Sequence, residues 1–111
     1  MPEVELEFEV AEQGELTVVT LVGELDLVTA PVLRARLEDL IAAAPAIQLV
    51  VDLEGVDFLD SAGLGVLMST LNSVREAGGA FRLVCTRPRL LKVFEITALT
   101  EVLDIRSTVE G

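Results

Sequence analysis

Ser61 is the residue of this 111-residue chain whose surroundings best suit it to take part in chemistry. It lies in the stretch Asp60-Ser61-Ala62-Gly63-Leu64-Gly65, between an aliphatic run typical of a buried strand and a periodic run typical of an amphipathic helix. A hydroxyl at the start of a helix is well placed to carry a phosphate, because the free backbone amides and the helix dipole stabilise an anion. Alternatively, Asp60 or Ser61 only caps the helix, a role that contributes about 1 kcal/mol. The spacing alone favours the cap.

The other residues offer little for catalysis. The chain has no His, which excludes Ser-His-Asp and Cys-His arrangements and the His-containing metal sites. Gly63 and Gly65 are not followed by the Lys and Ser or Thr of a phosphate-binding loop. Four acidic residues could gather a cation: Asp26, Glu54, Asp57 and Asp60. Acids on loops are more often solvated, so we expect no enzymatic activity, no cofactor and no bound metal.

The charge of the chain is strongly acidic. The formal net charge is −11, and eight acidic residues precede the first basic residue, Arg34. This balance opposes binding to nucleic acid or to an anionic membrane, and it favours association with a basic partner surface or simply confers solubility. The cluster of basic residues near the C-terminus, which we expect to be a solvated face, consists of Arg82, Arg87, Arg89 and Lys92.

Several features predict the compartment and the domain organisation. The single cysteine, Cys85, lies in an apolar run, so we expect it to be buried and not disulfide-bonded. The acidic segment 1–5 lacks the pattern of a signal peptide, and no apolar run approaches the ~20 residues that span a bilayer. We therefore expect a soluble, cytoplasmic protein with one domain over residues 1–111.

The apolar patterning predicts an α/β fold that begins with a β-hairpin. The predicted strands are 4–10, 16–22, 47–53, 81–86 and 102–105, with the hairpin turn at 11–14. The predicted helices run from a Thr29 cap with Pro31 in the first turn to Pro45, from Leu64 to a stop at Gly78-Gly79, and from Pro88 to about Leu99. Strands and helices alternate after the hairpin, which predicts a mixed, largely parallel sheet.

Polar residues predict which side of this sheet the helices cover. The residues that interrupt one face of otherwise apolar strands are Gln48, Asp52, Arg82 and Thr86. We therefore expect the helices to lie mainly on the opposite face, with the polar face partly open. The carboxyl edge of such a sheet, where Ser61 falls, is the edge at which ligands and partners of α/β folds usually bind.

Three stretches of the chain together resemble a known family. The first is Asp60 to Gly65, which Asp52-Leu53 and Val56 to Leu59 precede. The second is Gly23 to Asp26, which Thr29-Ala30-Pro31 follows. The third is Leu83-Val84-Cys85 together with Val93-Phe94 and Leu99. This pattern resembles the STAS domains found in bacterial anti-sigma factor antagonists, and the resemblance spans nearly the whole chain. The serine-centred stretch is the most specific part of the match.

The resemblance implies a phosphorylation switch. In this family a cognate anti-sigma factor, a serine kinase that uses ATP and magnesium, phosphorylates the serine, and a partner serine phosphatase reverses the modification. Unmodified Ser61 would then lie in the surface that binds the kinase, so that binding releases a sigma factor and phosphorylation breaks the complex. The residues that the resemblance implies for partner binding are Asp26, Asp60, Ser61, Gly63, Leu64 and Gly65.

Two alternatives remain open from the sequence. One is an unswitched STAS interaction subunit of a larger stress-sensing or transport-associated complex. The other, which the residues favour least, is a metal-dependent or acid-dependent enzyme built on Asp26, Asp57 and Asp60. For either STAS function we expect no direct contact with nucleic acid and a monomer when the protein is free.

Overall fold

The computed structural model describes residues 6–110, and the chain begins there with a β-hairpin. Strand β1 (Leu6–Gln13) pairs antiparallel with β2 (Leu16–Leu25) through a two-residue turn at Gly14-Glu15, where Gly14 has φ +61°. Val4 and Glu5, which we predicted to start β1, lie outside the described residues. The prediction that β1 stops at Val10 is wrong, because backbone pairing continues after the apolar alternation has ended.

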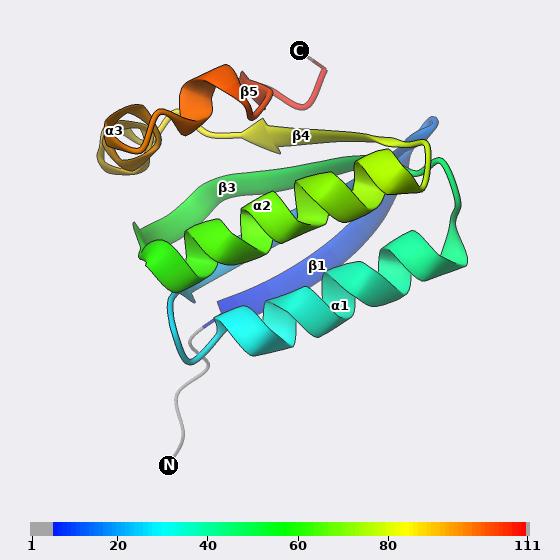
Figure 1. Ribbon diagram of the computed structural model, residues 1–111, viewed down its shortest axis with the longest axis horizontal. Helices are drawn as coiled ribbons and strands as arrows, with labels where there is room; N and C mark the ends of the chain where they lie inside the picture. The colour runs from blue at the N-terminus through cyan, green and yellow to red at the C-terminus, as the bar shows by residue number, and fades with distance from the viewer. Residues whose placement is uncertain (1–5, 111) are drawn as a thin grey trace.

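The remaining elements build a mixed sheet with helices on one face. They are α1 (Ala30–Ala43), β3 (Gln48–Leu59), α2 (Ser61–Glu76), β4 (Ala80–Val84), α3 (Pro88–Ile96), the 3-10 helix η1 (Leu99–Glu101) and β5 (Ile105–Arg106). The strand order is β1-β2-β3-β4-β5, and every pair after the hairpin is parallel. Figure 1 shows α1 and α2 side by side on the same face of the sheet. The predicted fold class is confirmed.

The main core lies between the sheet and the two long helices. The buried side chains of α1 and α2 in this core are Leu33, Leu37, Ile41, Val66, Leu67, Leu71 and Val74. The opposite face of the sheet is not simply open, since it buries Val18, Val50 and Val84 in a smaller cluster against which Val109 packs. Arg82 Nη1 donates a hydrogen bond to the carbonyl oxygen of Val109 at 2.9 Å, which holds the C-terminal residues over this face.

Strand β3 is longer than predicted, and the reason is a bulge. We expected the strand to end at Leu53, because the polar Glu54 and the following glycine are typical of a loop. Instead the Asp52 carboxylate accepts a hydrogen bond from the Glu54 amide at 2.9 Å, the register with β2 shifts, and the strand continues to Leu59. A Cβ on Gly55 would lie 2.8 Å from Val22 Cγ2, so a residue without a side chain allows the two strands to stay in contact here.

The C-terminal elements are shorter than predicted. Helix α3 ends at Ile96 and not near Leu99, because Ala98 adopts a left-handed conformation (φ +61°) before the short η1. The last strand covers only Ile105–Arg106 and not 102–105, because Val102 still closes η1. Strand β4 likewise ends at Val84, two residues before the predicted end.

Gly79 provides a test of how the end of α2 is joined to the sheet. A Cβ on this residue would lie 2.2 Å from the carbonyl oxygen of Ile47, a backbone atom that cannot move independently. We expect Gly79→Ala to lower the free energy of unfolding by about 1–3 kcal/mol in urea denaturation. Gly65→Ala is the control, since Gly65 lies in a helix with no atom within 4 Å of an added Cβ, and it should be stabilising by about 0.5–1 kcal/mol. Equal stabilities of the two variants would contradict this account.

Candidate functional site

The site is built where β2 and β3 end side by side. Leu25 and Leu59, the last residues of the two strands, are paired across the sheet. One residue further on, the backbone amide of Asp60 donates a hydrogen bond to the carbonyl oxygen of Leu25 at 3.2 Å. The loop that follows β2 and the start of α2 are therefore joined at this edge, which brings the neighbourhood of Asp26 next to that of Ser61.

Asp60, and not Ser61, caps helix α2. Its Oδ1 atom accepts hydrogen bonds from the backbone amides of Ala62 at 2.9 Å and Gly63 at 3.1 Å. Ser61 is the first residue of the helix and is exposed. Within residues 6–110 no hydrogen bond involves the Ser61 hydroxyl. The capping role that the sequence left open therefore does not occupy this hydroxyl, which stays free on the surface.

Asp26 fixes the loop between β2 and α1. Its Oδ1 atom accepts hydrogen bonds from the amides of Val28 and Thr29, both at 3.0 Å. The Thr29 hydroxyl accepts from the amide of Asp26 and donates to the carbonyl oxygen of Glu24, both at 2.9 Å. The prediction that the Thr29 hydroxyl caps α1 is thus wrong, because this side chain is directed back to the preceding strand and makes no cap hydrogen bond. Pro31 does lie in the first turn, as predicted.

The two glycines of the motif occupy different environments. Gly63 is buried, and a Cβ there would lie 2.7 Å from Leu25 Cγ and from Leu59 Cδ1. Because Gly63 has no side chain, α2 can approach the ends of β2 and β3 closely. Gly63 therefore positions the first turn of α2, which carries Ser61. Gly65 is exposed with open space around it, and Leu64 between them is half-buried. Gly65 therefore leaves room at the surface for another molecule to approach the helix.

The other acids proposed as a cation site are bonded to groups of the protein. The Glu54 carboxylate accepts hydrogen bonds from the amide and the hydroxyl of Thr86, at 2.7 and 2.5 Å. Asp57 forms an ion pair with Arg87, whose Nη2 atom lies 2.9 Å from Asp57 Oδ1. No group of three or more metal-ligating side chains exists among the residues that the structure describes. The prediction of a solvated basic face is correct for Arg89 and Lys92, which are exposed. It is wrong for Arg82 and Arg87, which are half-buried and hydrogen-bonded to the protein.

Two further features add no reactive group to this edge. Cys85 is buried, as predicted, and burial raises the pKa of its thiol.

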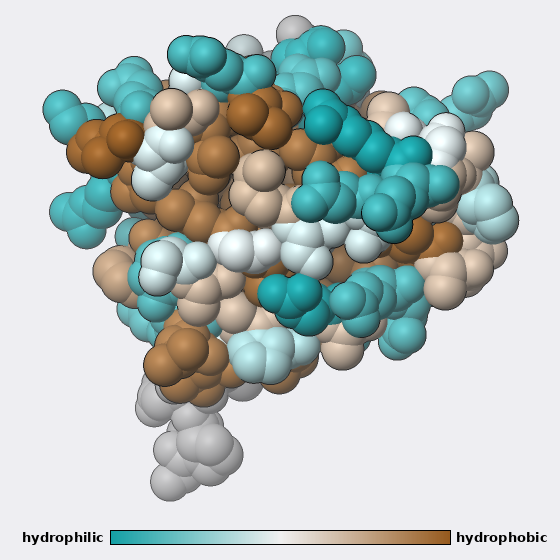
Figure 2. All heavy atoms as spheres, in the orientation of Figure 1, coloured by the Kyte–Doolittle hydropathy of each residue, from teal (hydrophilic) through white to brown (hydrophobic). Residues whose placement is uncertain are grey.

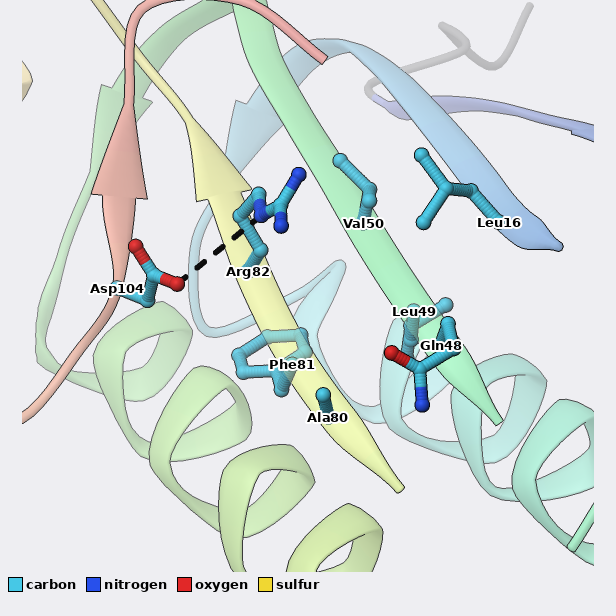
Figure 3. Close-up of a pocket in the computed structure, with 8 residues that line it drawn as sticks. All are labelled: Leu16, Gln48, Leu49, Val50, Ala80, Phe81, Arg82 and Asp104. Carbon is cyan, nitrogen blue, oxygen red and sulfur yellow. Dashed lines mark ion pairs between the residues drawn. The ribbon is translucent and has the colours of Figure 1, made fainter. Parts of the chain in front are cut away.

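A small hollow at the amino ends of β3 and β4 is lined by Leu16, Gln48, Leu49, Val50, Ala80, Phe81, Arg82 and Asp104. Figure 3 shows that the guanidinium in this hollow faces the carboxylate of Asp104, 4.0 Å away. The hollow thus lies at the opposite end of β3 from Ser61.

Three apolar residues close to the site were not predicted from the sequence. Leu27 and Val28 in the β2–α1 loop, and Val32 in the first turn of α1, are exposed. One signal could have identified Val32: it falls outside the stripe of α1 residues that face the core. Leu27 and Val28 carry no such signal, because their exposure depends on the conformation that Asp26 imposes on the loop.

Comparison with known proteins agrees with this architecture. The family model of the STAS domain matches residues 7–111, and the chain therefore belongs to the STAS domain family. It is similar to an anti-sigma-B factor antagonist of Bacillus subtilis (strain 168), with 39% identity over 93 residues that cover 84% of each sequence.

Solved structures give the same result. An anti-sigma factor antagonist from Mycobacterium paratuberculosis superposes with a TM-score of 0.85 at 30% identity, covering 95% of this chain and 88% of that one. The phosphorylated form of the Bacillus cell fate determinant SpoIIAA superposes with a TM-score of 0.70 at 25% identity, covering 94% of both chains. None of the helices between residues 6 and 110 has the length and apolar composition that a membrane crossing requires.

The cap of α2 can be tested separately from any function. Asp60→Ala removes the acceptor of two backbone hydrogen bonds, so we expect it to lower the free energy of unfolding by about 1 kcal/mol. Asp60→Asn keeps an acceptor oxygen and should lose less. Urea denaturation of both variants provides the measurement. Equal losses would show that these hydrogen bonds do not account for the effect of Asp60.

Proposed function

We propose that this protein is an anti-sigma factor antagonist. It binds a cognate anti-sigma factor that is also a serine kinase, and this binding releases a sigma factor. Phosphorylation of Ser61 by the same kinase ends the interaction. The observation that carries the proposal is the exposed Ser61 hydroxyl at the start of α2, which makes no hydrogen bond within residues 6–110, while Asp60 supplies the cap.

The position of Ser61 suits a reversible phosphate. The γ-phosphoryl group of ATP, held with magnesium by the kinase, is transferred to Ser61 Oγ; the hydroxyl proton passes to a base of the kinase, and ADP leaves. A phosphate there lies at the positive end of the α2 dipole, which stabilises it. It adds about −1.5 to −2 charges close to the Asp60 carboxylate. A serine phosphatase then removes the phosphate, so the antagonist itself catalyses neither step.

The surroundings of Ser61 explain why the phosphate would oppose binding. Gly65, one turn along the helix, leaves the surface open to a close approach by the kinase. A phosphate on Ser61 fills part of that space and brings a charge that is costly to desolvate in a tight contact. We assign Asp26, Asp60, Leu64 and Gly65 to the binding surface and Gly63 to the support beneath it.

The remaining properties follow from this function. The antagonist works in the cytoplasm, where its kinase and the sigma factor are found, and it is a monomer when free. Its net charge of −11 suits a basic surface on the protein partner and opposes direct contact with nucleic acid.

Intact-mass spectrometry tests the switch directly. Purified wild-type protein and Ser61→Ala are incubated with ATP, magnesium and each anti-sigma kinase of the same genome. We expect one kinase to add a single phosphate to the wild type and none to Ser61→Ala. If no kinase modifies the wild type, the phosphorylation switch is excluded and the unswitched STAS subunit becomes the better description.

Charge substitution tests the effect on binding. We expect Ser61→Ala to bind the kinase and Ser61→Asp to lose at least about tenfold in affinity, because a carboxylate must be desolvated at the contact. Asn72→Asp is the matched control, since it adds the same charge to an exposed position of α2 about 16 Å along the helix axis. Equal affinities of Ser61→Ala and Ser61→Asp, measured by calorimetry, would contradict the switch.

A further inference from the structure

The most exposed large apolar side chains of the described residues are concentrated beside Ser61. The exposed fractions are 74% for Leu27, 68% for Val28, 63% for Val32 and 74% for Ile96. Three of these four belong to the β2–α1 loop and the first turn of α1. We refer to Leu27, Val28 and Val32 as the loop patch. Figure 2 shows apolar surface over this loop, at the lower left of the view.

The three side chains of the loop patch are held as a group. Val28 directly precedes Thr29, which already has helical backbone angles (φ −85°, ψ −23°), and Val32 lies in the first turn of the helix that follows. The Asp26 carboxylate binds the amides of Val28 and Thr29, which fixes the outward course of the loop. An apolar surface that is already ordered loses little conformational entropy when a partner covers it.

The loop that carries Leu27 and Val28 is joined to the start of α2, where Ser61 lies. The amide of Asp60 binds the carbonyl oxygen of Leu25, two residues before Leu27. Gly63 also lies close to Leu25, since a Cβ there would be 2.7 Å from Leu25 Cγ. A partner that covers Ser61 therefore also meets the loop that carries Leu27 and Val28.

Acidic groups border the loop patch. Glu24 and Asp26 precede it in the chain, and Asp60 lies across the junction with α2. The arginines of α1 are engaged elsewhere: Arg34 donates to the Ser69 hydroxyl, and Arg36 stacks 4.3 Å from the centre of the Phe8 ring. The border of the loop patch is thus negative.

We propose that the loop patch is the apolar centre of the surface that docks the anti-sigma factor kinase; this inference rests on the proposed function. The matching surface of the kinase is apolar with a basic border. A second copy of this chain is a poor occupant, because it would bring two acidic borders together in a protein of net charge −11. An anionic membrane is disfavoured for the same reason.

Binding measurements in the Ser61→Ala background separate docking from phosphorylation. Leu27→Ser and Val32→Ser are titrated by calorimetry with the kinase that phosphorylates the wild type. We expect each to raise the dissociation constant at least about tenfold, as for apolar residues at the centre of an interface. Ile96→Ser is the matched control, because Ile96 is as exposed as Leu27 but lies at the end of α3, and it should bind like the parent.

The outcomes distinguish this inference from the proposed function. If Leu27→Ser and Val32→Ser bind as tightly as Ile96→Ser, the loop patch is not the docking surface, although the antagonist function stands. If the parent binds no kinase, both proposals fail. Sedimentation of the free protein provides a second test: a dimer that Leu27→Ser converts to a monomer would assign the loop patch to self-association and overturn the inference. Thermal unfolding monitored by circular dichroism verifies that the variants remain folded.

Discussion

The parallel pairing of β2 with β3 up to their last residues is the constraint on which the rest of the site depends. Because Leu25 and Leu59 end opposite each other, the Asp60 amide can bind the Leu25 carbonyl oxygen and α2 can begin next to the end of β2. The buried Gly63 makes this close approach possible. The register of β3 against β2 shifts twice, between Thr20 and Val22 and between Gly23 and Glu24, before Leu25 and Leu59 pair beside the loop that Asp26 shapes.

Much of the architecture could be predicted from the sequence, because apolar periodicity reports burial directly. The hairpin, the helices over one face and the largely parallel sheet all follow from it, and so does the position of Ser61 at the start of α2. Strand ends were less predictable. Glu54 and Gly55 have the composition of a loop, yet the hydrogen bond from the Glu54 amide to the Asp52 carboxylate turns them into a bulge within β3.

Side-chain roles at the site were the least predictable part. Thr29 has the residue type of a helix cap, but its hydroxyl oxygen accepts a hydrogen bond from the amide of Asp26 and its hydroxyl donates to the carbonyl oxygen of Glu24, so the side chain is directed away from the α1 amides. The acids likewise look interchangeable in the sequence, whereas in the fold Asp57 pairs with Arg87 and Asp60 binds backbone amides. The Asp60 cap is a local contact that the sequence already offered, whereas the Asp57–Arg87 ion pair joins distant residues and depends on the tertiary structure, which local spacing does not contain.

The division of roles between Asp60 and Ser61 has a consequence for the lifetime of the protein in the cell. Since the Asp60 carboxylate secures the helix and no group within residues 6–110 bonds the Ser61 hydroxyl, we expect the phosphorylation proposed for Ser61 to leave the folded state intact. The modified form would then escape the quality control that removes unfolded chains. The phosphorylated protein would accumulate in folded form. Removal of the phosphate would then restore binding without new protein synthesis.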